Sequence, residues 1–354
     1  MALSIGIVGL PNVGKSTLFT ALTRKGGLAA NYPFATIEPN VGVVEVPDER
    51  LHKLAEIVKP ARILPATVEF LDIAGLVKGA NKGEGLGNQF LANIRETDAI
   101  VEVLRYFSDG NVIHVEGESD PVRDVDIIKT ELILADLATV EKAIPRLEKE
   151  AKRDKNLAAK LETVKELQGW LNEGHRALRF DMTDEQREHI YDLHLLTMKP
   201  MLYVANVDED QAASQPEAID GVSPIPISAK VESEIIDMDA TEAKEFLEMM
   251  GLEQSGLERL IKAAYQLLGL QSYFTAGEVE VRAWTVPVGA KAPQAAGVIH
   301  TDFERGFIKA ETIGYNDFIA GNGEAGARAA GKMRLEGKDY IVQDGDVMHF
   351  KFNV

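Results

Sequence analysis

A glycine-rich segment near the start of the chain restricts the possible folds more than any other feature. Gly9-Leu10-Pro11-Asn12-Val13-Gly14-Lys15-Ser16 matches the pattern G-x-x-x-x-G-K-[ST] at every fixed position. It follows the apolar, β-rich run Leu3–Val8 and precedes the helix-like run Thr17–Arg24. This strand–loop–helix order is the context in which such a P-loop binds nucleotide phosphates, so a chance glycine-rich turn is the weaker interpretation.

The residue types in this loop suit phosphate binding. Glycines let backbone amides converge on phosphate oxygens, and the following helix presents the positive end of its dipole. We predict that the amides from Asn12 to Thr17 bind the phosphates. Lys15 is expected to reach the β- and γ-phosphates, and the Ser16 hydroxyl is the expected ligand of Mg²⁺.

Two later segments supply the rest of a predicted magnesium–phosphate site. Asp72-Ile73-Ala74-Gly75 ends the apolar run Thr67–Ile73. Asp72 is placed to hold a water bound to Mg²⁺, and Gly75 can offer its amide to the γ-phosphate. Thr36 lies in the loop before the run Val41–Val46, where a switch loop carries a threonine that binds Mg²⁺ beside a γ-phosphate. An ordinary loop threonine is the alternative for Thr36.

The segment that would select the base departs from the GTPase pattern N-K-x-D. Asn206-Val207-Asp208-Glu209 follows the apolar run Met201–Ala205. Val207 replaces the lysine that packs on the base, and Glu209 replaces the aspartate that accepts hydrogens from guanine N1 and N2. Losing a charge-assisted pair to guanine weakens binding by about 1.5–3 kcal/mol, roughly tenfold to a hundredfold.

Adenine presents the reverse pattern of hydrogen-bonding groups. The Asn206 side chain can provide both an acceptor for N6 and a donor for N7. Ser228-Ala229-Lys230 follows the run Ile225–Ile227 and is the expected second loop at the base, with Ser228 and Ala229 among the nucleotide-binding residues. We therefore predict a preference for ATP over GTP, and a true GTPase is the alternative.

The group that orients the attacking water is not evident from the P-loop motifs. Leu76 occupies the position at which Ras-like enzymes carry a glutamine, and it cannot hydrogen-bond. His114, in the polar loop Ser108–Asp120, is the candidate because an imidazole exchanges protons near neutral pH, although an inert loop histidine is the alternative. An asparagine at the position of Asn12 can bind K⁺ between the phosphates in related proteins, which makes K⁺ a candidate cofactor.

The order of apolar runs predicts an α/β fold with an insertion and a C-terminal extension. Short β-rich runs alternate with helical stretches early in the chain and return after the insertion, as in a doubly wound, mostly parallel sheet. Apolar residues spaced 3-4-3-4 before the polar break Arg153–Asn156, and a similar apolar seam after it, predict two antiparallel helices. A period-two run at Val279–Val286 and β-type runs at Tyr340–Phe352 predict a small α+β domain. The predicted domains are a nucleotide-binding domain at 1–125 and 198–268, a helical domain at 126–197 and a C-terminal domain at 269–354.

Composition narrows the class of protein. The 354 residues carry a formal net charge of −18, which argues against nonspecific coating of nucleic acid by the whole surface. There is no cysteine, so disulfides, thiolate metal sites and cysteine nucleophiles are excluded and a reducing cytosol is favoured. No apolar run approaches the ~18 residues of a membrane span. We expect a soluble, cytoplasmic protein without a membrane partner and, since no dimer seam is evident, a monomer.

With these motifs together, the sequence resembles the YchF/Obg-like family of translation-factor-related P-loop ATPases over essentially its whole length. The P-loop, the Asn-x-x-Glu motif at 206–209, the helical insertion and the runs Tyr273–Gly277 and His300–Phe307 carry the resemblance. The resemblance implies ATP hydrolysis, a C-terminal domain with the β-grasp fold of TGS domains, a catalytic role for His114, and association with ribosomes and thereby RNA. Leu104-Arg105-Tyr106 departs from the less basic strand end that we expect of the family.

Three functions follow from these observations. The first is a slow, Mg²⁺-dependent ATPase whose nucleotide state controls its binding to the ribosome in translation or stress regulation. The second is a GTPase of the Obg-related class. The third is a regulatory protein that binds a nucleotide with negligible hydrolysis. Leu76 is compatible with this function because it cannot hydrogen-bond to the attacking water.

Overall fold

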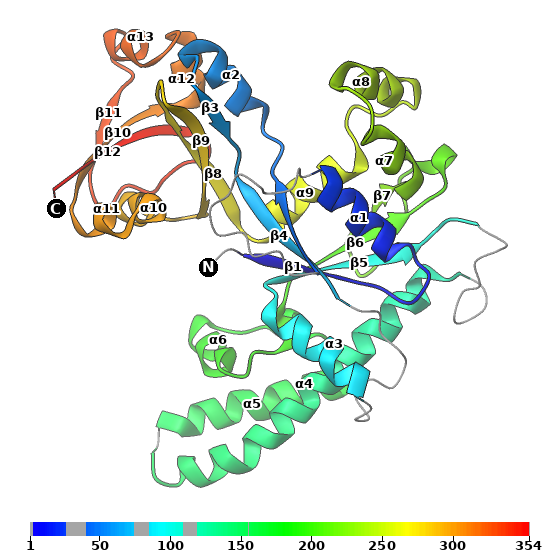
Figure 1. Cartoon of the computed structure of the whole chain (residues 1–354). Helices are drawn as coiled ribbons and strands as arrows, with labels where there is room; N and C mark the ends of the chain where they lie inside the picture. The colour runs from blue at the N-terminus through cyan, green and yellow to red at the C-terminus, as the bar shows by residue number, and fades with distance from the viewer. Residues whose placement is uncertain (1–2, 26–39, 74–84, 109–118, 155, 354) are drawn as a thin grey trace. The chain divides into compact units, whose positions relative to one another are not determined.

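The computed structural model of the chain describes residues 3–25, 40–73, 85–108, 119–154 and 156–353. The chain groups into two compact units, which Figure 1 shows with their helices and strands labelled. The first unit contains Met1–Gly42 and Glu69–Leu260, and the second contains Val43–Val68 and Ile261–Val354. Two sheets, each of six strands within the described residues, form the centres of these units.

The first sheet contains the strands predicted from the early apolar runs and from the two runs after the insertion. They span Ser4–Val8 (β1), Val41–Glu45 (β2), Thr67–Asp72 (β4), Ala99–Arg105 (β5), Met201–Asn206 (β6) and Ile225–Ile227 (β7). The order is β2-β4-β1-β5-β6-β7, and the pairs from β4 through β7 are parallel. Strands β1 and β5 are buried at every position, as expected for central parallel strands covered on both faces. The predicted α/β fold of the P-loop type is confirmed.

Helices flank the first sheet on both faces. The helices of the first unit include Lys15–Lys25 (α1), Gly85–Glu96 (α3), Pro121–Ala151 (α4), Ala229–Ile235 (α7) and Ala240–Met249 (α8), which packs against α7. Helix α9 (Gly256–Leu267) begins in the first unit and ends in the second. Helices α1 and α7 lie on one face, and α3 and α4 lie on the other (Figure 1). Because the paired strands are parallel, the loops that follow β1, β4, β5 and β6 meet at one edge of the sheet, where ligands of such folds bind.

The insertion is a helical arm in which α4 packs against a second long helix. Val140 and Leu147 on α4 share a buried cluster with Val164 and Leu171, as the predicted 3-4 spacing requires. No helix in the described part of the chain combines the length and the apolar composition needed to span a bilayer. The remaining elements of the arm are α5 (Asn156–Asn172), α6 (Asp184–Tyr191) and 3₁₀ turns at Ala177–Arg179 and Leu196–Met198.

A buried aspartate fixes the point at which the arm returns to the sheet. The Asp136 carboxylate on α4 accepts hydrogen bonds from the backbone amides of Leu196 and Thr197, both at 2.8 Å, and from the Thr197 hydroxyl at 2.6 Å. A buried carboxylate is tolerated only when donors replace its lost water. Asp136 therefore sets the path of the chain immediately before β6.

The second unit has a sheet with helices on both faces. Its strands lie in the order β11-β10-β12-β8-β9-β3, with the first long strand, β8, parallel to the last, β12. Tyr273 and Phe350 lie in the core between the sheet and the helix α10. The elements are α2 (Glu49–Val58), β3 (Arg62–Leu64), β8 (Leu270–Ala276), β9 (Glu280–Pro287), α10 (Ala292–Ile299), α11 (Thr301–Arg305), β10 (Phe307–Gly314), α12 (Tyr315–Ala320), α13 (Glu324–Ala329), β11 (Arg334–Glu336) and β12 (Asp346–Phe352).

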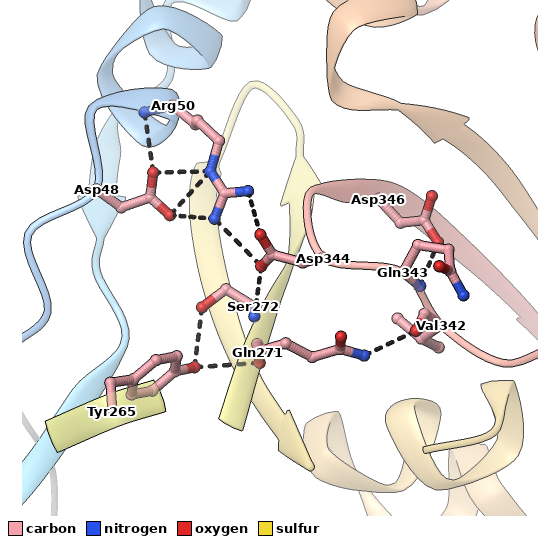
Figure 2. A network of polar contacts seen from close by, with 9 residues as sticks. All are labelled: Asp48, Arg50, Tyr265, Gln271, Ser272, Val342, Gln343, Asp344 and Asp346. Atoms are coloured by element: carbon pink, nitrogen blue, oxygen red, sulfur yellow. Dashed lines mark hydrogen bonds and ion pairs between the residues drawn. The ribbon is translucent and has the colours of Figure 1, made fainter. Parts of the chain in front are cut away.

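The segment 43–68, whose ends belong to β2 and β4 of the first sheet, groups with the second unit, whereas the sequence predicts it in the nucleotide-binding domain. Its strand β3 extends the second sheet by parallel pairing with β9, with Arg62 opposite Glu280. Arg50 on α2 also forms ion pairs with Asp48 and with Asp344, in the turn before β12 (Figure 2). The β3–β9 pairing and the ion pair between Arg50 and Asp344 join residues far apart in the sequence, so no local pattern indicates them.

Candidate functional site

The P-loop connects β1 to α1 and requires its glycines for steric reasons. Gly14 has a φ of 90°, and a Cβ atom there would collide with the side-chain nitrogen of Asn206. A Cβ atom at Gly9 would lie 2.9 Å from the carbonyl oxygen of Val103 on β5. Asn12 also has a positive φ, 65°, which asparagine tolerates better than most residues. The loop therefore packs closely against the ends of β5 and β6.

The start of α1 provides amides and a positive end for an anion. The first helical hydrogen bond runs from the Leu18 amide to the Gly14 carbonyl at 3.0 Å, so the amides of Lys15 to Thr17 precede the helical ladder. No acidic residue lies in the first turn of α1. Ser16 and Thr17 are exposed at this end. This arrangement suits the phosphate-binding role predicted for the loop.

Lys15 and Asp72 meet at the edge of the sheet. The Lys15 ammonium and the Asp72 carboxylate form an ion pair, and their side chains are only 11% and 19% exposed. Ile7 on β1 stands opposite Asp72 on β4, which brings the end of β4 beside the P-loop. The structure thus brings together Lys15 and Asp72, two of the four residues predicted to act in hydrolysis, the others being Gly75 and His114. Gly75 and His114 lie outside the described residues, as do Thr36 and Leu76.

Asn206 joins the base-reading motif to the P-loop. Its side-chain nitrogen donates to the Val13 carbonyl at 2.9 Å, and its side-chain oxygen accepts from the Ala229 amide at 3.4 Å. Asn206 is only 6% exposed. Each of its two polar atoms therefore already has a partner in the protein, and only one further hydrogen and one lone pair stay available for a base.

The remaining residues of the two base loops have roles within the protein. Val207 is buried, so its side chain offers little surface to a base. Ser228 caps α7 by accepting a hydrogen bond from the Val231 amide at 3.5 Å. Glu209 forms an ion pair with Lys230, whose pKa is raised by that hydrogen bond. The sequence places Lys230 in the second base loop and does not indicate its partner.

Asp208 is the residue of the motif to which the sequence pattern assigns no role. Its carboxylate accepts a hydrogen bond from the Ser108 amide at 3.0 Å. The Tyr106 amide donates to the Asn206 carbonyl at 2.9 Å, so the chain leaving β5 stays beside the base motif. The position of Asp208 at the start of the turn Glu209–Gln211 indicates a capping role, and only the folded structure reveals the longer-range contact.

Comparisons with known proteins identify the family. The family model YchF-GTPase C, described as "Protein of unknown function (DUF933)", matches residues 270–353, and the model described as "50S ribosome-binding GTPase" matches residues 4–131. The chain is 56% identical to the "Ribosome-binding ATPase YchF" of Bacillus subtilis and 57% identical to the protein of that name from Escherichia coli O157:H7, over 100% of both chains in each comparison. The structure of the Schizosaccharomyces pombe YchF GTPase has a TM-score of 0.90 at 40% identity, covering 99% of this chain and 98% of that one. Similarity of this extent along the whole length shows that the chain belongs to the YchF family.

Proposed function

We propose that the chain binds ATP with Mg²⁺ at the P-loop and slowly hydrolyses it to ADP and phosphate. The approach of Lys15 to Asp72, at the ends of two adjacent strands, carries this proposal. The Lys15 ammonium suits the β- and γ-phosphates, and the Asp72 carboxylate suits a metal-bound water. The two groups lie together beside the P-loop. Relatives that match the chain over its whole length are named ATPases.

The side chains beside the P-loop suit Mg²⁺, which prefers oxygen ligands and keeps several bound waters. Ser16 exposes a hydroxyl at the start of α1, and Asp72 brings a carboxylate from the end of β4. We assign Ser16 and Thr36 as the protein ligands and Asp72 as the acceptor for a bound water. When bound, the metal neutralises charge on the phosphates, while Lys15 and the loop amides hold them in place.

Hydrolysis needs a group that positions water, and Leu76 cannot do so. We assign this role to His114, since its imidazole can hold or move a proton near neutral pH. The Gly75 amide would bind the γ-phosphate. K⁺, bound with the help of Asn12, is a second candidate cofactor. Equal ATPase rates in KCl and in NaCl would remove K⁺ from the mechanism.

Base selection rests on the altered motif after β6. Glu209 stands where a GTPase carries aspartate, and its carboxylate is already paired with Lys230. The names of the relatives differ on the base, since the bacterial proteins are called ATPases and the Schizosaccharomyces pombe protein is called a GTPase. We favour ATP, and a GTPase of the Obg-related class is the second candidate. A nucleotide-binding regulator with negligible hydrolysis is the third.

The ribosome is the proposed partner, because the bacterial relatives are named ribosome-binding. Two surfaces could contact ribosomal RNA or protein. One is the helical arm, where α4 exposes Lys142 and Lys149 and the residue after it, Lys152, is also exposed. The other is the C-terminal unit, for which we propose a TGS-like β-grasp fold on the strength of its parallel first and last strands. We accordingly place the protein in the cytoplasm, as a monomer that switches with its nucleotide.

Affinity for ATP and GTP, measured side by side by calorimetry with Mg²⁺, tests the proposal. We expect tighter binding of ATP by about tenfold or more, because Glu209 replaces the guanine-reading aspartate. Lys15→Met should abolish binding of both nucleotides. Tighter binding of GTP would overturn the ATP assignment. Failure to sediment with ribosomes in any nucleotide state would overturn the partner.

A further inference from the structure

The two loops at the base side of the site are joined by successive contacts. Strands β6 and β7 pair with Asn206 opposite Ile227. Beyond the strands, the Val207 amide donates to the Ile227 carbonyl at 3.0 Å, and the Ala229 amide donates to the Asn206 side chain at 3.4 Å. The outermost contact in this series is the ion pair between Glu209 and Lys230. The backbone of both loops therefore holds the two charged side chains within reach of each other.

The Lys230 ammonium is directed to Glu209 although a second carboxylate is close in the sequence. Glu234 stands four residues later in α7, a spacing that commonly supports ion pairs on a helix. Lys230 instead forms its ion pair with Glu209, in the turn after β6. The hydrogen bond to Glu209 is the main cause that raises the pKa of Lys230, and Glu234 contributes less. The tertiary arrangement, and not the helix, selects the partner of Lys230.

This pairing has a different consequence for each purine. Guanine presents N–H donors at N1 and N2, which a free carboxylate accepts. An ammonium group is a donor without acceptor capacity, so Lys230 competes with guanine for the Glu209 oxygens. Adenine has a lone pair at N1 and no amino group at C2, and gains nothing from a free carboxylate at that position. Lys230 therefore opposes guanine binding and leaves adenine binding unaffected.

We propose that Lys230 is a specificity-determining residue that holds the Glu209 carboxylate away from guanine. This inference rests on the proposed purine nucleotide site and assigns part of its base selection to a residue outside the Asn-x-x-Glu motif. Because Lys230 and Glu209 are 69% and 45% exposed, water screens their attraction, and the expected effect is modest. We expect Lys230 to lower GTP affinity about fivefold.

The test is a set of binding measurements on the full chain with non-hydrolysable analogues of ATP and GTP. In Lys230→Met, we expect GTP-analogue affinity to rise about fivefold while ATP-analogue affinity changes less than twofold. Lys230→Arg keeps the cation and should behave as the wild type. Lys244→Met is the matched control, since Lys244 is also an exposed lysine paired with a glutamate, Glu248 at 3.8 Å.

A double variant decides whether Lys230 acts through Glu209. In Lys230→Met with Glu209→Gln, the gain in GTP affinity should disappear, because the freed carboxylate is gone. An unchanged GTP-to-ATP ratio in Lys230→Met, or a gain that persists in the double variant, would overturn the inference. Absence of nucleotide binding by the wild type would instead overturn the proposed function, so the two failures are distinguishable.

Discussion

The Asp208 carboxylate accepts a hydrogen bond from the backbone amide of Ser108 at 3.0 Å. An aspartate that begins a helical turn usually caps the amides of that turn, but Asp208 makes no such bond to the turn Glu209–Gln211. Its side chain instead reaches the segment that follows β5. Ser108 is followed in the sequence by the segment that contains His114, the proposed water-orienting residue. Asp208 therefore links the base motif to the start of that segment.

Removing this link should slow hydrolysis more than it weakens binding. In Asp208→Ala, we expect the single-turnover rate of ATP hydrolysis to fall about tenfold, because Ser108, which precedes the segment with His114, loses its hydrogen bond to residue 208. The affinity for an ATP analogue should stay within about threefold, since one partly exposed hydrogen bond contributes little. Rapid-quench measurement of the rate and calorimetry of the analogue check the two expectations separately.

Two variants control for indirect effects at this position. Asp208→Asn keeps an oxygen that can accept the Ser108 amide proton, so it should recover most of the rate. Asp210→Ala changes an exposed neighbouring aspartate and should leave the rate unchanged. Equal rates for Asp208→Ala and the wild type, with hydrolysis present in both, would exclude a positioning role for Asp208.

Asn206 supports the site through two hydrogen bonds inside the protein, so its loss should weaken the binding of both nucleotides. Asn206→Ala removes a donor to the Val13 carbonyl and an acceptor for the Ala229 amide. Each buried hydrogen bond contributes about 1 kcal/mol, so we expect affinity for ATP and for GTP to fall about 10- to 30-fold together. Competition of each nucleotide with a labelled analogue measures this, and Asn172→Ala, an exposed change in the helical arm, is the control.

The alternative for Asn206 is direct reading of adenine. In that arrangement, Asn206→Ala would reduce ATP affinity and leave GTP affinity unchanged. A selective loss of this kind would show that the amide contacts the base, and that its two contacts within the protein are secondary. A parallel loss for both nucleotides would show that Asn206 holds the P-loop against the second base loop.

Much of the first unit could be predicted because its signals are local. The P-loop motif, the apolar strand before it and the helix after it lie within a short stretch, Leu3–Arg24. The 3-4 spacing in the arm likewise predicts which side chains of α4 and α5 are buried. Each of these patterns depends on the period of one helix or strand, which the sequence displays directly.

The rest of the site could not be predicted because it depends on contacts between distant segments. Glu209 lies in the turn after β6 and Lys230 in the first turn of α7, and the two charged residues meet because β6 and β7 are neighbours. The side-chain nitrogen of Asn206 donates to the carbonyl of Val13, which is 193 residues earlier in the sequence. A motif specifies the residue types that can read a base, whereas the fold decides which of their atoms are still available to it.

Glu102 makes the stability of the first unit depend on pH. It lies on β5 with 1% exposure, and neither carboxyl oxygen has a hydrogen-bond partner in the described structure. Burial raises its pKa well above the usual value, and the nearby Asp124 raises it further, while Arg176 opposes the shift. The folded protein therefore keeps this carboxyl protonated at a pH where the unfolded chain has released the proton.

The sign of the pH effect follows from this proton balance. The contribution of Glu102 to stability is fully present below its unfolded pKa of about 4.3 and is lost as the pH rises toward the folded pKa. Glu102→Gln removes the titration, so the free energy of unfolding of this variant relative to the wild type should increase as the pH rises above about 4.3, by at most about 1.4 kcal/mol per pH unit, and level off above the folded pKa of Glu102. Urea unfolding followed through Trp170, in the Trp284→Phe background, measures the first unit. Glu96→Gln, an exposed change, is the control, and a constant difference between Glu102→Gln and the wild type would contradict the prediction.

Arg50 crosslinks three segments of the second unit (Figure 2). It donates to Asp48 at 2.8 and 2.9 Å and to Asp344 at 2.7 Å, and Asp344 also accepts from the Ser272 amide on β8 at 3.1 Å. The Arg50 side chain also lies over the ring of Phe274, 5.1 Å from its centroid. The segment 43–68, the turn before β12 and β8 are thereby held together by one guanidinium group.

Replacing this guanidinium should destabilise the second unit. Arg50→Met leaves Asp48 and Asp344 without their shared cation, and we expect the free energy of unfolding to fall by about 1–2 kcal/mol. The exposure of Asp344, 51%, limits the effect because water can solvate the freed carboxylate. Arg50→Lys should recover only part of the loss, since an ammonium cannot make the paired contacts of a planar guanidinium. Urea unfolding followed through Trp284, in the Trp170→Phe background, measures this unit, and stability of Arg50→Met equal to that of the wild type would show that the ion pairs are energetically neutral.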